Sequence, residues 1–154
     1  MWAVLRTLPA FLSAVLVCSV LAAIFQTQFN LAALQNVGLE VSLGLRIKTT
    51  LLDILGFAPF FALLVSCAYA LALPIAVWLG GYVPKAYVVL CMLTGTVGVW
   101  CALALANGVA PMPTLIAADR TLWGTSCLLL AAALGAWVFG YVYKKVISRA
   151  YQHD

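Results

Sequence analysis

Four long stretches without a charged residue divide this chain, and they constrain its fold more than any other feature. They cover residues 8–25, 57–79, 86–106 and 122–142, and each is 18 to 23 residues long. A helix needs roughly 20 apolar residues to cross the hydrocarbon core of a bilayer, since each residue adds about 1.5 Å. Barrel strands are about half as long and alternate in polarity. The four runs therefore predict four transmembrane helices.

The composition favours a membrane location for the whole chain. Of its 154 residues, 66% are hydrophobic and 8% are charged, whereas soluble domains carry about 25% charged residues. So few charges cannot solvate the surface of a soluble domain of this size. The same balance excludes a nucleic-acid-binding protein and a disordered chain. We therefore predict an all-α integral membrane protein, a four-helix bundle in which residues 1–154 form one membrane domain.

The first apolar run has a second interpretation, because a basic residue followed by an apolar run is also typical of a secretory signal peptide. Arg6 would then be the basic residue and residues 8–25 the apolar core. That core is longer than the 7–15 residues usual in signal peptides. We therefore interpret it as a helix that is retained in the protein.

Basic residues between the runs predict the orientation, because cytoplasmic loops carry an excess of Lys and Arg. With four spans both termini lie on one side of the membrane. The cations on that side are Arg6, Lys85, Lys144, Lys145 and Arg149, and those on the other side are Arg46, Lys48 and Arg120. The excess predicts that both termini, including a tail over residues 143–154, are cytoplasmic. We place the protein in a bacterial inner membrane.

The segment 26–56 is predicted to be a long outer loop with secondary structure of its own. Apolar and polar residues alternate over residues 39–48, which is typical of a strand with one buried face. A weaker alternation over residues 25–31, followed by a turn-like segment 35–38, favours a two-stranded hairpin. An interfacial helix over residues 31–37 is the alternative for the first half.

The second half of this loop carries the predicted docking surface. On the strand, Leu43 and Leu45 are expected to face inward. After it, Thr50 as the cap and Asp53 three residues later predict a short interfacial helix that ends at Gly56. The polar positions expected to contact a membrane-protein partner are Glu40, Ser42, Arg46 and Lys48.

The four runs offer little chemistry. None contains Asp, Glu, His, Lys or Arg, the residues through which ion-coupled transporters and pumps act inside a membrane. No hydrolase, zinc-protease or phosphate-loop motif is present. The cysteines form no C-x-x-C pair and are interpreted as inert thiols buried in the helices: Cys18, Cys67, Cys91, Cys101 and Cys127. The sequence thus predicts no catalytic residue, cofactor or metal site.

Small and polar residues inside the runs predict how the helices pack. Small residues at recurring spacings let helix backbones approach closely, and they form three stripes: Ala62, Ser66 and Ala70; Gly95, Gly98 and Ala102; Ala132, Ala136 and Gly140. Tyr69 and Trp100 need hydrogen-bond acceptors in hydrocarbon. With Ser66 and Thr96 nearby, they either bond the neighbouring backbone or line a small pocket for an apolar ligand with one polar end.

Three functions fit these features. The first is a small accessory or scaffold protein that acts without catalysis on a partner membrane complex, through its helices and outer loop. The second is an oligomeric carrier or channel for a neutral or lipophilic solute. The third is a membrane enzyme whose chemistry resides in a lipophilic cofactor. The expected partners are the lipid bilayer and either another membrane protein or further copies of the chain.

Overall fold

The computed structural model describes residues 2–109 and 116–150, and this part of the chain is all-helical, without a strand. Its elements are α1 (Trp2–Asn36), α2 (Leu43–Tyr82), the short 3-10 helix η1 (Pro84–Ala86), α3 (Tyr87–Val109), the 3-10 helix η2 (Ala117–Arg120) and α4 (Leu122–Ala150). The four α-helices are each long and apolar enough to cross a membrane. The predicted all-helical fold with four helices is therefore confirmed, and the length and composition of these helices fit the predicted spans.

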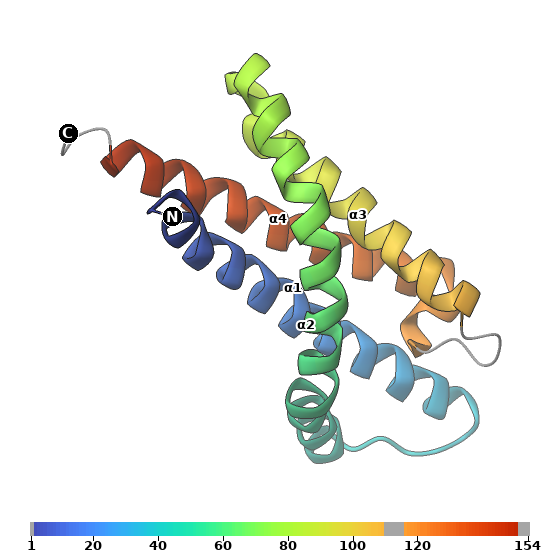
Figure 1. Cartoon of the computed structure of the whole chain (residues 1–154). Helices are drawn as coiled ribbons and strands as arrows, with labels where there is room; N and C mark the ends of the chain where they lie inside the picture. The colour runs from blue at the N-terminus through green and yellow to red at the C-terminus, as the bar shows by residue number, and fades with distance from the viewer. Residues whose placement is uncertain (1, 110–115, 151–154) are drawn as a thin grey trace.

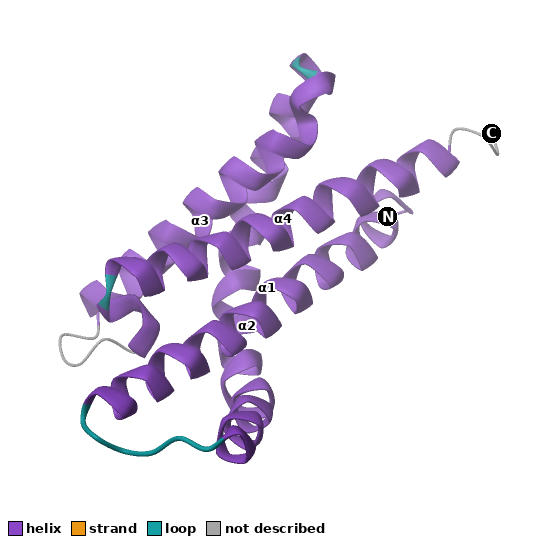
Figure 2. Ribbon diagram, turned by 180° about the vertical axis from the view of Figure 1, so that it is seen from behind, coloured by secondary structure: helices purple, strands orange, loops and turns teal. Residues whose placement is uncertain are grey.

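The four helices pack in a cycle. In the part of the chain that the structure describes, α1 packs against α2 and α4, α3 packs against the same two helices, and α1 does not touch α3. Helices α1 and α4 run side by side in opposite directions, while α2 crosses them obliquely (Figures 1 and 2). One end of the bundle carries the start of α1, the end of α4 and the turn at η1; we call it the terminal end. The opposite end, with loop 37–42 and η2, is the loop end.

Helices α1 and α2 both extend beyond their predicted bounds, and the prediction of a long outer loop between them is wrong. Helix α1 continues to Asn36 and α2 begins at Leu43, so only residues 37–42 connect them. Gly38 has φ +90° and its N–H donates to the Gln35 carbonyl, which is a common helix ending that suits glycine. Residues 31–36 are helical as in the alternative interpretation, but as a continuation of α1. The predicted tail is helical to Ala150, and residues 151–154 lie outside the described part.

The predicted strand and hairpin are wrong because the alternating residues belong to a helix with its polar face inward. Ser42 caps α2 by accepting a hydrogen bond from the Leu45 N–H at 3.2 Å. Leu43 is 78% exposed and Leu45 46% exposed, so the two leucines expected inside face outward. Lipid stabilises outward apolar side chains. An alternation of polar and apolar residues near a membrane therefore does not require a strand with a buried face.

Helix α2 is too long to be one straight span. Its 40 residues correspond to about 60 Å, roughly twice the hydrocarbon core. Its first turns are seen nearly end-on in Figure 1, whereas the rest lies across the view. Gly56 and Pro59 follow the first turns along the helix, and a proline leaves the carbonyl four residues earlier, here of Leu55, without its helical donor. We call residues 43–56 the arm; the predicted short helix after Thr50 is part of it.

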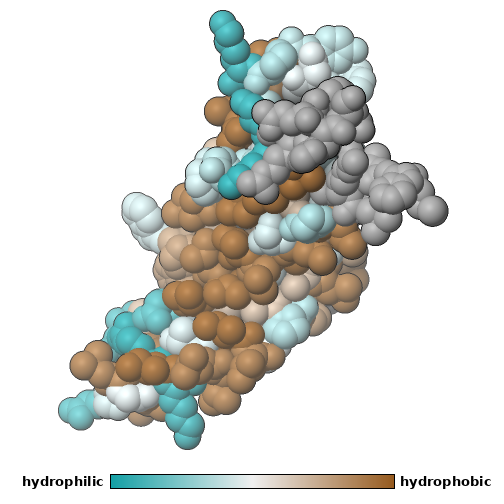
Figure 3. Space-filling model, turned by 90° about the vertical axis from the view of Figure 1, so that its left-hand side faces the viewer, coloured by the Kyte–Doolittle hydropathy of each residue, from teal (hydrophilic) through white to brown (hydrophobic). Residues whose placement is uncertain are grey.

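Small residues allow the closest helix contacts, as predicted for α3 and α4. A Cβ at Gly95 would lie 2.5 Å from the Ala136 Cβ, and one at Gly98 would lie 2.7 Å from the Ala72 Cβ. The stripe predicted for α2 is wrong. The alanines that α2 buries are Ala58, Ala68, Ala72 and Ala76, whereas Ala62 and Ser66 are half-buried and Ala70 is exposed. Apolar residues cover the middle of the surface, with polar residues toward the ends (Figure 3).

Candidate functional site: a lateral groove beside a buried tyrosine

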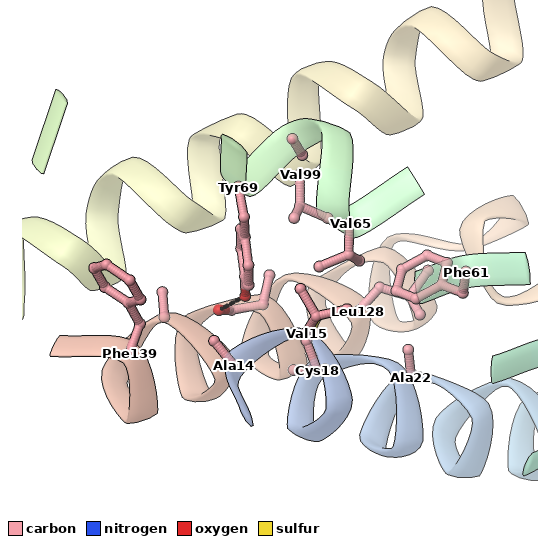
Figure 4. Packing of buried hydrophobic residues seen from close by; sticks show 14 of the residues in the cluster. Ala14, Val15, Cys18, Ala22, Phe61, Val65, Tyr69, Val99, Leu128 and Phe139 are labelled. Carbon is pink, nitrogen blue, oxygen red and sulfur yellow. Dashed lines mark hydrogen bonds between the residues drawn. The ribbon is translucent and has the colours of Figure 1, made fainter. Parts of the chain in front are cut away.

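Tyr69 lies where three helices meet. It is fully buried, and its hydroxyl donates to the Ala132 carbonyl of α4 at 2.5 Å. Figure 4 shows the ring pointing from α2 into the space between α1 and α4. A Cβ at Gly135 would lie 2.7 Å from this hydroxyl and 2.7 Å from the Ala14 carbonyl of α1. The absence of a side chain at Gly135 is therefore what allows α1, α4 and the tyrosine to approach one another.

The structure does not bring together the four residues predicted to line a ligand pocket. The Thr96 hydroxyl donates to the Met92 carbonyl of its own helix at 2.7 Å. Trp100 is 54% exposed on the outer surface, and Ser66 is half-buried on α2. Of the four, Tyr69 lines the cavity described next. Its hydroxyl is already bonded to backbone, so it contributes its ring to the cavity and not a free polar group.

A groove of about 710 Å³ lies between the terminal halves of α1, α2 and α4. It arises because α2 crosses α1 obliquely and barely contacts α4, so the three helices separate toward that end. The lining residues are Thr7, Leu8 and Phe11 of α1, Tyr69, Ala70, Leu73, Pro74, Val77 and Trp78 of α2, and Phe139 and Tyr143 of α4. Leu8, Pro74 and Trp78 are exposed on the outer surface of the bundle. The groove is therefore open to the side of the bundle, where lipid would lie.

A second, smaller cavity of about 390 Å³ adjoins the groove at its terminal end, because Val77 and Tyr143 line both. We call it the mouth. It is also lined by Gly80, Gly81, Pro84, Tyr87 and Lys144. A Cβ at Gly80 would lie 2.3 Å from the Tyr87 ring, so a glycine is needed there for the ring to pack on α2. The Tyr87 and Tyr143 rings then lie 6.0 Å apart and form one wall of the mouth.

The described carboxylates are confined to one end of the bundle, whereas basic residues lie at both ends. The lysines whose side chains the structure describes at the terminal end are Lys85, Lys144 and Lys145, and all three are exposed. The described carboxylates are Glu40, Asp53 and Asp119, and all three lie at the loop end. The groove therefore opens toward the end at which the described lysines have no described carboxylate beside them.

Polar side chains at the loop end bond the arm to α1. Arg46 Nη1 donates to Gln28 Oε1 at 2.7 Å and its Nη2 donates to Gln35 Oε1 at 3.4 Å. The fully buried Thr27 donates to Asp53 Oδ2 at 2.7 Å. Arg46 and Asp53 lie seven residues apart on one face of the helix. This face, and not an apolar one, holds the arm against the bundle.

A second set of hydrogen bonds holds η2 at the same end. Gln26 Oε1 accepts from the Ala118 N–H at 2.8 Å. Asp119 accepts from the Asn107 amide and from the Thr125 hydroxyl, the latter at 2.8 Å. These bonds join residues of α1, α3 and α4 to η2. The polar residues of the loop end thus bond mainly to one another, which indicates a structural role.

The predicted docking residues do not share one face. Glu40 is exposed in the loop, Ser42 caps α2, and Lys48 is exposed on the arm. Arg46 instead points toward α1 and bonds to Gln28. The strand on which the predicted face depended is absent from the described residues, and with it the reason for grouping the four.

The cysteines are only partly as predicted. Cys18 and Cys91 are buried, Cys127 is half-buried, and Cys67 and Cys101 are exposed; all five are free. The two exposed thiols line a further apolar cavity of about 510 Å³ between α2 and α3. Among the residues with described positions, no three His, Cys, Asp or Glu side chains are placed to hold a metal ion.

Of the groove residues, the sequence singled out Tyr69 alone, because most of the other walls are ordinary apolar span residues that come together only when α2 crosses α1. The sequence analysis also missed the hydrogen bonds between the arm and α1. A pattern that could have predicted them exists, because Arg46, Thr50 and Asp53 recur at helical spacing and bond to the polar residues 27 and 28 of α1. Comparison with known proteins found no matching family model, no similar curated protein and no similar solved structure.

Proposed function

We propose that the protein binds an amphiphilic lipid in the groove, with a hydrocarbon chain along the apolar walls and the polar end at the mouth. The observation that carries this proposal is the cavity of about 710 Å³ that opens to the side of the bundle. Binding sites for small molecules commonly measure 300–1,000 Å³ and are mostly apolar with few polar groups. A lateral opening lets a lipid enter from the bilayer without crossing water.

The residues of the groove suit binding and not catalysis. Leu8, Phe11 and Leu73 offer apolar contacts to a chain, and Phe139 closes the inner side. The Tyr69 hydroxyl is bonded to the Ala132 carbonyl, so it has no free hydrogen to offer a substrate. The proposed role belongs to the carrier class for lipophilic solutes, with the lipid as the bound molecule.

The test compares two substitutions on α2. Ala70 lines the groove, so Ala70→Phe should fill it; Leu63 is exposed on the same helix and does not line it, so Leu63→Phe is the matched control. After exchange into lipid-free detergent, native mass spectrometry should find one retained lipid on the wild-type chain and on Leu63→Phe, and none on Ala70→Phe. Equal retention by the two variants, or none by the wild-type chain, would contradict the proposal.

We infer that the terminal end faces the cytoplasm of a bacterial inner membrane. The excess of Lys and Arg supports this orientation. Five basic residues belong to the terminal end in the sequence and three to the loop end: Arg6, Lys85, Lys144, Lys145 and Arg149 against Arg46, Lys48 and Arg120. In a background without native cysteines, an impermeant maleimide added to intact cells should label a cysteine placed at Ser42. It should not label one placed at Lys85. The reverse pattern would invert the orientation.

A second candidate function is that of an accessory protein that contacts a membrane complex through the arm. It is favoured by the outward residues of the arm, since Leu43, Ile47 and Leu55 are each more than 60% exposed while the polar face is held by α1. A photoreactive residue placed at Ile47 in cells should then yield one discrete protein adduct. Adducts with lipid alone would show that the arm lies against the bilayer.

A further inference from the structure

We propose that the groove selects an anionic phospholipid, whose headgroup has a net negative charge and lies at the mouth beside Lys144. This inference rests on the proposed function and adds the class of headgroup. The mouth and the groove adjoin through Val77 and Tyr143, as the headgroup and chain of one lipid do. Lys144 is the charged side chain among the residues that line the two cavities.

The position of Lys144 suits a phosphate. It is exposed on α4 next to Tyr143, and an ammonium group is a strongly hydrated point charge that commonly binds phosphate. Across the mouth, Gly81 of α2 has no atom within 4 Å of the place where a Cβ would be. The mouth therefore has room beside the lysine for a headgroup.

The charges around the mouth also complement an anion. The described carboxylates Glu40, Asp53 and Asp119 all lie at the loop end, so none of them can neutralise Lys144 or repel a phosphate there. Lys85 and Lys145 add positive charge at the same end. Basic pockets between transmembrane helices on the cytoplasmic side bind anionic headgroups in this way.

The experiment uses the fluorescence of Trp78, which lines the groove. In a variant with the other four tryptophans changed to Phe, Trp78 is the one indole that a bromine-labelled chain can quench. The protein is reconstituted in phosphatidylcholine vesicles that contain equal fractions of brominated phosphatidylglycerol or brominated phosphatidylcholine. One charge contact near an anionic surface corresponds to about five-fold tighter binding. The brominated phosphatidylglycerol should therefore bind about five-fold more tightly than the brominated phosphatidylcholine.

Two lysine variants separate a site from a general surface charge. Lys144→Gln should remove the preference for the anionic lipid. Lys85→Gln also removes one positive charge from the terminal end, but Lys85 does not line either cavity. The Lys85→Gln variant should therefore keep the preference for the anionic lipid. An equal loss in both variants would overturn the inference, because the preference would then come from the surface potential.

Ala70→Phe in the same background distinguishes failure of this inference from failure of the proposed function. In one outcome, Ala70→Phe lowers quenching by both brominated lipids, and the protein with Ala70 in place shows no preference between the two lipids. The groove then binds lipid, but the inferred selectivity for an anionic headgroup is wrong. If Ala70→Phe changes quenching by neither lipid, the groove does not hold a chain and the proposed function fails. The proposed function and the inferred headgroup selectivity are both supported if the preference for the anionic lipid is lost in Ala70→Phe and in Lys144→Gln but kept in Lys85→Gln.

Discussion

Gly135→Ala should destabilise the bundle, because a methyl group at this position of α4 would overlap with α1 and with the Tyr69 hydroxyl. The new Cβ would lie 2.7 Å from the Ala14 carbonyl oxygen, 2.7 Å from the Tyr69 hydroxyl and 2.8 Å from the Cys18 Cβ. Ordinary contacts begin near 3.4 Å, so each neighbour must move by about 0.7 Å. Two of them belong to α1, whose backbone cannot yield without shifting the helix.

The expected loss follows from these contacts. Overpacking of a dense core costs about 1–3 kcal/mol. A displaced Tyr69 also weakens its bond to the Ala132 carbonyl, and interhelical hydrogen bonds in membranes contribute about 0.6 kcal/mol on average. We therefore expect Gly135→Ala to lower the free energy of unfolding by roughly 2–3 kcal/mol. Unfolding in mixed micelles of increasing dodecyl sulfate content, followed by circular dichroism, measures this loss.

Two further variants test the mechanism. Gly108 has nothing within 4 Å of its Cβ position, so Gly108→Ala should change stability little and serves as the control. Tyr69→Phe removes the hydroxyl that the new methyl group meets, so Gly135→Ala should cost less in that background, and the two changes should not be additive. Equal stability of Gly135→Ala and Gly108→Ala, or strict additivity with Tyr69→Phe, would refute the reasoning.

Two further predictions concern the arm and the thiols. Ser42→Ala should lower stability by about 1 kcal/mol because the cap of α2 is lost, whereas Ser42→Asp should keep it; equal losses in mixed-micelle unfolding would argue against the cap. In detergent, N-ethylmaleimide should modify Cys67 and Cys101 faster than Cys18 and Cys91, since the first pair is exposed and the second buried. Mass spectrometry of the four sites over time measures the rates, and a buried thiol that reacts as fast as Cys67 would contradict the packing.

The sequence alone determined the membrane class, the number of spans and their centres. Uncharged runs of about 20 residues have few other stable structures, because backbone groups in lipid must bond within their own segment. The close approaches at Gly95 and Gly98 were also predictable, since small residues recur along α3. These features depend on local composition and spacing, which a sequence records directly.

The tertiary structure decided the ends of α1 and α2, the orientation of the arm and the groove. The segment 39–48 alternates in polarity, and only its contact with Gln28 and Gln35 of α1 shows that Arg46 faces inward. The groove depends on the angle at which α2 crosses α1, and apart from Tyr69 its walls are mostly ordinary span residues. In lipid, apolar side chains are stable on either side of a helix, so hydropathy locates a membrane helix but does not say which face meets its neighbours.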